Sequence, residues 1–149
     1  MPAYKGRFVP RTPEKYKGNP TNIVYRSSWE LKFMGYLDKN PNVLQWASEE
    51  IAIPYRSPLD KKWHRYFPDF IVRMRDADGN TVVKMIEIKP MSQSVPPEIR
   101  QNSQRITKKY LREVMTYGIN NAKWEAAKEF CADRNWQFVV LTEKNVNFI

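Results

Sequence analysis

The turn-forming segment DADGN, residues 76–80, constrains the fold of this chain more than any other feature of the sequence. It lies between two segments rich in β-branched and aromatic residues, 63–75 and 81–89, the second of which reads TVVKMIEIK. Tight turns favour Asp, Gly and Asn, so the pattern predicts a β-hairpin. If all five residues form the loop, Arg75 faces Thr81, and this pairing fixes every other pairing along the two strands.

The register of the hairpin decides whether two carboxylates meet. With a five-residue loop, Asp69 lies directly opposite Glu87, and directly opposed side chains share a face with their Cβ atoms about 4.5–5.5 Å apart. A two-residue turn at Asp78-Gly79 would move the pairing by one residue and separate the two acids. Because side chains alternate along a strand, Lys89 shares the face of Glu87. The sequence therefore predicts two acids and a lysine at one end of the hairpin, provided that the loop is long.

These three residues have an apolar neighbourhood, where a carboxylate is unfavourable unless a positive group compensates it. Two adjacent carboxylates also repel each other, so either one is protonated or a cation lies between them. Lys89 is one candidate for the cation, and a purely structural ion pair between Glu87 and Lys89 is the simplest interpretation.

A hard divalent cation is the other candidate. Asp69, Glu87 and the backbone carbonyl of Ile88 would suit Mg²⁺, or Mn²⁺ in its place. Such a metal activates water and stabilises the charge that develops on a phosphodiester during hydrolysis. Lys89, beside the metal, would orient the water or neutralise the phosphate.

The composition narrows the choice of partner and of chemistry. Lysine and arginine number 25 against 16 aspartate and glutamate, a formal net charge of +9, which favours a nucleic acid, with an anionic membrane surface as the alternative. No apolar run reaches the roughly 18–20 residues of a membrane span, and no signal-peptide pattern is visible. The single histidine, His64, and the single cysteine, Cys131, exclude a histidine-based triad and a multi-thiolate zinc site. We expect His64 at the surface and Cys131 in the core, in a reducing, cytoplasmic setting.

Two features precede the hairpin. Residues 1–20 carry four prolines and several basic residues, which predicts an extended basic arm along phosphates or a partner, or else a disordered terminus. Ser27 and Glu30 then form a capping-box pattern that predicts a helix ending near residue 40. The cap alone would explain Glu30. In the alternative, Glu30 is a further metal ligand, direct or through water. Arg26, Ser27 and the N-terminus of the helix would then be able to bind a phosphate.

The remaining elements complete an α/β or α+β order. We expect a short strand near residues 50–53, helices at 101–115 and 121–134, and a strand at 136–141. Lys108, Lys109 and Arg112 form either a solvated helix face or a ridge that contacts phosphates. The order α, β, β, β, α, α, β predicts a layered sheet-and-helix sandwich, with residues 21–149 as a single domain.

Pro68-Asp69 and Glu87-Ile88-Lys89, preceded by a helical Glu30, resemble the PD-(D/E)-x-K nuclease superfamily. The segments YRSSWELKFMGYLD, YFPDFIV, IEIKP and NNAKWEAAKEFCADRNWQFVVLTE resemble the head completion nucleases of T4-like tailed bacteriophages. TnsA-like endonucleases of transposons share the helical Glu, the PD-F strand and the E-x-K-P strand. The resemblance implies a restriction-endonuclease-like core, a central mixed sheet flanked by helices in the order αβββαβ, to which this chain adds one helix.

The resemblance also implies a function. The chain would be a Mg²⁺-dependent DNA endonuclease, also able to act as an exonuclease, that works on packaged double-stranded DNA during head completion and head–tail joining. Glu30, Asp69, Glu87 and Lys89 would be catalytic, and Lys123 would face the DNA backbone. Head or neck proteins of the phage would be partners, in the host cytoplasm during assembly or in the virion.

Two alternatives to this function stay open. One is a non-catalytic, DNA-binding head–tail connector on a nuclease-like fold, against which the full set of four motif residues argues. The other is a transposon endonuclease subunit, against which the short chain argues. The sequence gives no indication of the oligomeric state.

Overall fold

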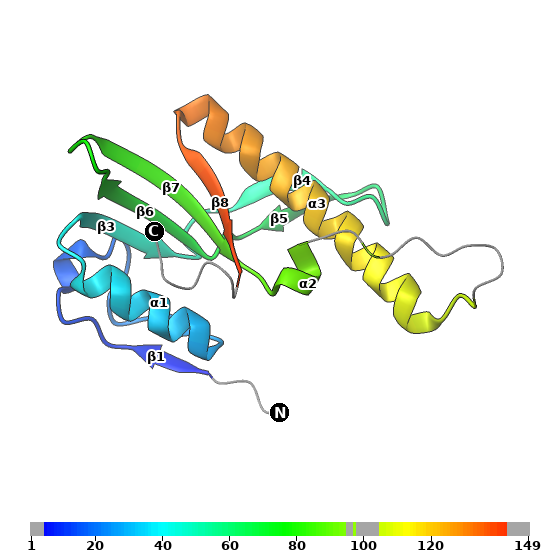
Figure 1. The fold of residues 1–149 in the computed structure, drawn as a ribbon, viewed down its shortest axis with the longest axis horizontal. Helices are drawn as coiled ribbons and strands as arrows, with labels where there is room; N and C mark the ends of the chain where they lie inside the picture. The colour runs from blue at the N-terminus through cyan, green and yellow to red at the C-terminus, as the bar shows by residue number, and fades with distance from the viewer. Residues whose placement is uncertain (1–4, 95–96, 98–104, 143–149) are drawn as a thin grey trace.

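A four-stranded mixed sheet forms the centre of the domain in the computed structural model, which describes residues 5–94, 97 and 105–142 (Figure 1). Its strands, in spatial order, are β3 (Val43–Ser48), β6 (Phe70–Arg75), β7 (Thr81–Ile88) and β8 (Gln137–Leu141). The first three pair antiparallel, and β8 pairs parallel with β7. The predicted central mixed sheet is confirmed.

Helices cover both faces of this sheet. Helix α1 (Ser28–Lys39) buries Phe33, Met34 and Leu37 against one face, where the Phe33 and Phe70 rings lie 5.0 Å apart. Helix α3 (Lys108–Arg134) packs on the other face through residues such as Trp124. The short helix α2 (Met91–Ser94) follows β7 directly. None of the helices in the described part of the chain has the length and apolar character needed to cross a membrane.

The hairpin between β6 and β7 has the predicted register. Arg75 faces Thr81 and Phe70 faces Ile86, so the loop contains five residues. The Asp76 carboxylate holds the loop open by accepting the backbone N–H groups of Asp78 and Asn80, each at 2.9 Å. A turn of only two residues at positions 78–79 would lose these hydrogen bonds, which explains the longer loop.

The predicted strand at 63–75 is in fact two strands in two sheets. Strand β5 (Trp63–Tyr66) pairs with β4 (Ile53–Arg56) in a small separate sheet, and β6 begins only at Phe70. Pro68 lies in the break between them, because proline cannot donate the backbone hydrogen bond of a central strand. The strand expected at 50–53 is also wrong except at Ile53, which begins β4: residues 50–52 link β3 to β4, and Glu49 has a left-handed backbone with φ of 53°.

The two helices expected at 101–115 and 121–134 form one helix over the described residues. Helix α3 has 27 residues, from a Thr107 cap, which accepts the Tyr110 N–H at 3.0 Å, to a left-handed Asn135. The sequence 117–121 does not interrupt it, since glycine and asparagine lower helix propensity without forbidding a helix. Residues 101–104 lie outside the described residues. Figure 1 shows the first half of α3 projecting beyond the sheet.

Residues 5–20 of the expected basic arm are packed on the domain. Strand β1 (Gly6–Phe8) pairs with β2 (Ile23–Tyr25), and a short 3₁₀ helix, η1 (Pro13–Lys15), follows. Tyr16 enters the core beneath α1, with its ring 4.8 Å from that of Trp46. The interpretation of this segment as a disordered terminus is therefore wrong for residues 5–20, while residues 1–4 lie outside the described residues.

Candidate active site

A hollow of about 350 Å³ opens where β7 ends, β6 begins and α1 starts. It is lined by Ser27, Trp29, Glu30, Asp69, Ile88, Lys89, Pro90 and Gln93. We call it the catalytic hollow. Three of the four residues with predicted catalytic roles line it, and the fourth, Glu87, lies buried beside it in β7. The fold thus brings the predicted set together from three separate elements.

Asp69 lies between Pro68 and the first residue of β6. Its Oδ2 atom accepts the backbone N–H of Ile88 from the neighbouring strand at 2.8 Å. Burial raises the pKa of the Asp69 carboxyl well above its ordinary value, and the nearby Glu87 charge raises it further. The Ile88 hydrogen bond and Lys89 oppose these effects without cancelling them. Asp69 therefore sits where a positive charge would be strongly favoured.

Glu87 is buried, with 4% of its surface exposed. Its Oε2 atom accepts a hydrogen bond from the hydroxyl of Tyr66, and its Oε1 atom lies 3.8 Å from the Lys89 ammonium. Burial raises the pKa of Glu87, whereas the Tyr66 hydrogen bond, Lys89 and Lys123 lower it. Burial and the adjacent Glu87 charge also raise the pKa of Tyr66, so its hydroxyl remains a donor.

Tyr66 is the site residue that the sequence analysis missed. A single strand over 63–75 would place residues 66 and 69 on opposite faces, because an odd separation reverses the side-chain direction. The break at Pro68 removes that restriction. The proline within the apparent strand was the one signal in the sequence that side-chain directions would not alternate regularly from residue 66 to residue 69.

Glu30 caps its helix and faces the catalytic hollow at the same time. The Ser27 hydroxyl accepts the Glu30 N–H at 3.1 Å and donates to the Glu30 Oε2 atom at 3.2 Å, which confirms the predicted cap. Burial is the main cause that raises the pKa of Glu30. Among the described residues no three Asp, Glu, His or Cys side chains converge as a ready-made metal site. The role of Glu30 as a further metal ligand, direct or through water, stays a prediction.

The donor chemistry of Asp69 and Glu87 fits a hard divalent cation. Both groups offer carboxylate oxygens, and the pKa of each is raised mainly by burial. A cation held by both would offset this burial and their mutual repulsion. Ile88, whose carbonyl is the third predicted ligand, also lines the hollow.

Lys123 reaches the same site from α3. Its ammonium lies 5.8 Å from the ring centroids of both Tyr55 and Tyr66. Burial lowers the pKa of Lys123, Lys89 lowers it further, and the charges of Glu87 and Asp69 oppose this change. The structure thus places a second lysine next to the acidic pair.

The other predicted DNA contacts are placed differently. Lys108, Lys109 and Arg112 are exposed on the projecting half of α3. Arg26 forms an ion pair with Glu49, which compensates part of the charge it would offer to a phosphate.

The single histidine and the single cysteine take no part in the site. His64, on β5, forms an exposed ion pair with Asp60, as expected of a surface residue. Cys131 is buried, and burial raises the pKa of its thiol to about 11.

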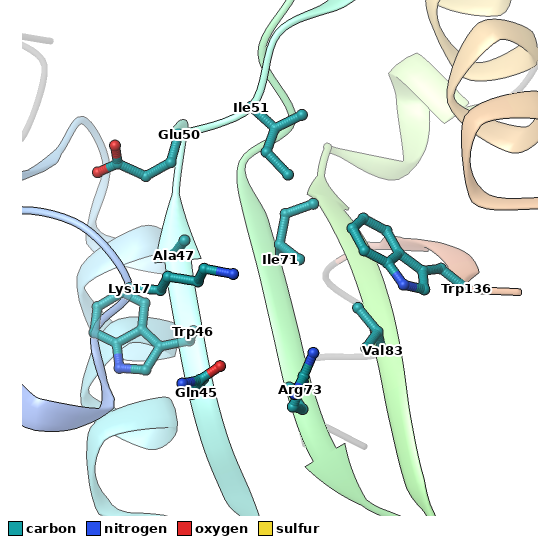
Figure 2. A pocket seen from close by; sticks show the side chains of 10 residues that line it. All are labelled: Lys17, Gln45, Trp46, Ala47, Glu50, Ile51, Ile71, Arg73, Val83 and Trp136. Atoms are coloured by element: carbon teal, nitrogen blue, oxygen red, sulfur yellow. The ribbon is translucent and has the colours of Figure 1, made fainter. Parts of the chain in front are cut away.

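A second hollow, of about 260 Å³, lies on the part of the α3 face of the sheet that α3 leaves open (Figure 2). We call it the sheet hollow. Ala47, Ile71 and Val83 lie along its strands, with Trp136 on one side and Arg73 at its edge (Figure 2). Among the described residues that line it, Glu50 alone is acidic, and its Oε2 atom accepts the Tyr16 hydroxyl at 2.7 Å. Its described lining thus lacks a carboxylate pair like Asp69 and Glu87.

Comparison with known proteins identifies the family of this domain. Residues 40–143 match the TnsA-like endonuclease N-terminal domain, a span that includes Asp69, Glu87 and Lys89. The chain belongs to the TnsA-like endonuclease family. The predicted restriction-endonuclease-like fold is therefore confirmed.

This TnsA-like chain also has a phage relative of the same size. It is 39% identical, over 142 residues, to the head completion nuclease of Enterobacteria phage T4. The alignment covers 95% of this chain and 92% of the phage protein, so it extends beyond the family match to include α1 and Glu30. The resemblance to both groups of nucleases is confirmed.

Proposed function

We propose that this protein is a Mg²⁺-dependent endonuclease that hydrolyses phosphodiester bonds of double-stranded DNA. The observation that carries the proposal is the pair Asp69 and Glu87, both with raised pKa values, beside Lys89 at an open hollow. Mn²⁺, with the same preference for oxygen ligands, is expected to replace Mg²⁺. Exonuclease action on DNA ends is part of the proposal.

Each residue of the site has a separate task in this proposal. Asp69, Glu87 and the Ile88 carbonyl would hold the metal, which supplies Lewis-acid activation of water and charge neutralisation. The Ile88 N–H orients Asp69, and the Tyr66 hydroxyl orients Glu87. Lys89, with 29% of its side chain exposed, is free to contact the scissile phosphate from beside Glu87. Glu30, which also lines the hollow, would act as a further ligand, directly or through water.

The similarity to the phage T4 head completion nuclease supports a biological setting. We place the protein in phage head completion and head–tail joining, acting on packaged DNA in the host cytoplasm during assembly or in the virion. Head and neck proteins would then be its partners. The 92% coverage of the phage protein supports this setting over that of a transposon endonuclease subunit.

Cleavage of supercoiled plasmid DNA tests the function. The purified protein should nick or linearise the plasmid in Mg²⁺ and stop when the metal is chelated. DNA affinity should fall steeply with salt, because neutralising phosphates releases counterions. Tight DNA binding without any cutting, in Mg²⁺ or Mn²⁺, would instead identify a non-catalytic connector.

A further inference from the structure

A groove of about 270 Å³ lies next to the catalytic hollow, between α2 and α3. Its polar lining includes Ser92 and Gln93 of α2 and Lys109, Arg112 and Thr116 of α3. Gln93 lines both the groove and the catalytic hollow, so the two depressions are neighbours. A DNA strand that extends from the catalytic hollow across α2 could therefore continue into this groove.

One face of α3 joins the groove to the catalytic residues. Lys109, Arg112, Thr116 and Lys123 follow one another at separations of three, four and seven residues, which keeps them on one side of a helix. With a rise of 1.5 Å per residue, Lys109 lies about 21 Å along the axis from Lys123, and Arg112 about 16 Å. Lys123 itself is close enough to Glu87 and Asp69 to feel both charges. Positive charge therefore continues outward from the acidic pair along α3.

We infer that this groove carries the sugar–phosphate backbone of the DNA on one side of the cut bond. The inference rests on the proposed nuclease function. Lys109 and Arg112 are exposed and positively charged, and Ser92, Gln93 and Thr116 can donate hydrogen bonds to phosphate oxygens. One strand of a duplex carries a phosphate every 3.4 Å, so about 21 Å corresponds to roughly six base pairs beyond the cut.

Glu113 also lines the groove and has the opposite effect. Its carboxylate repels phosphates that pass Lys109 and Arg112, so it limits the affinity of the groove for DNA. Neutralising this one residue should therefore tighten binding, a gain that structural damage to the groove would not produce.

Matched double variants of the full-length protein test the inference. Lys109→Ala/Arg112→Ala removes two positive charges from the groove. Lys39→Ala/Lys128→Ala removes two exposed positive charges from residues that line neither the groove nor the catalytic hollow. The groove variant should raise KM about tenfold or more, with kcat almost unchanged, and reduce the slope of log affinity against log salt by about two. The control variant should change KM less than about threefold, and Glu113→Gln should lower KM.

Substrate length gives a second, independent readout. Duplexes trimmed on either side of a mapped cut should bind the wild-type protein more weakly once one side is shorter than about six base pairs. The groove variant should lose this length dependence. Equal effects of the two double variants, or equal length dependence in all proteins, would overturn the inference. Unchanged DNA binding and cutting by the groove variant would do the same, and would leave the groove to a protein partner. The nuclease function would survive these results, since it depends on cutting by the wild-type protein.

Discussion

The catalytic hollow and the sheet hollow have similar sizes, about 350 and 260 Å³, yet only the catalytic hollow lies at the pair of acids that the proposed hydrolysis needs. Each has a glutamate at or beside it that accepts a tyrosine hydroxyl: Glu87, next to the catalytic hollow, from Tyr66, and Glu50, in the lining of the sheet hollow, from Tyr16. Each also has a positive side chain at its edge. The difference lies in the surroundings of the two glutamates. Glu87 is buried and has a second, half-buried carboxylate beside it, Asp69, whereas Glu50 is exposed and is the one acidic residue in the described lining of the sheet hollow. The presence of a neighbouring acid, rather than the volume of the depression, therefore distinguishes the site.

The largest expected difference between the hollows concerns the positively charged side chain that lines each of them. Lys89→Ala should lower kcat for plasmid cleavage by about 100- to 1,000-fold, because a positive group next to the scissile phosphate is lost. Arg73→Ala, at the edge of the sheet hollow, should change kcat less than about twofold. DNA binding measured by fluorescence anisotropy should persist in both variants. Comparable kcat losses in the two would remove the functional distinction between the hollows.

The two tyrosines provide a matched pair for the next effect. Tyr66→Phe should reduce kcat or Mg²⁺ affinity about 10- to 100-fold, as expected when a metal ligand loses the partner that orients it. Tyr16→Phe removes the hydroxyl that Glu50 of the sheet hollow accepts, and it should affect stability alone, by about 1 kcal/mol. Mg²⁺-dependent cleavage rates and chemical denaturation measure the two effects. An unchanged Mg²⁺ dependence and kcat in Tyr66→Phe would rule out its proposed role.

The smallest expected effect is a gain in stability. Folding raises the pKa values of Asp69 and Glu87, so the folded, metal-free protein binds protons more tightly than the unfolded chain. Its free energy of unfolding should therefore decrease as the pH rises from about 4 through the raised folded-state pKa values. Asp69→Asn should stabilise the metal-free protein at neutral pH by roughly 1–2 kcal/mol and weaken this pH dependence. Glu50→Gln, measured by the same denaturant titrations, should give no such gain.

Local chemistry explains which parts of the fold the sequence predicts. The register of the hairpin follows from residues 76–80 themselves, because the Asp76 carboxylate holds the loop. The Ser27–Glu30 cap is equally local. Both predictions needed only neighbouring residues, and they anticipated that Asp69 lies near Glu87 and that Glu30 lies in the first turn of α1.

Long-range packing explains what the sequence does not predict. The contact of Tyr66 with Glu87 depends on the interruption of the strand at Pro68 and on the pairing of β5 with β4. The position of Lys123 depends on α3 continuing as one helix across the α3 face of the sheet. Sequence periodicity carries no information about either contact, since it describes a single element at a time.

Cleavage by Asp69→Ala tests the central claim most directly. Supercoiled plasmid is incubated with wild-type or variant protein at equal concentration, with Mg²⁺ or with chelator, after circular dichroism has verified that the variant is folded. The account predicts nicked and linear products from the wild-type protein in Mg²⁺ alone, and none above background from Asp69→Ala. Cutting by Asp69→Ala at the wild-type rate would contradict the assignment of the site.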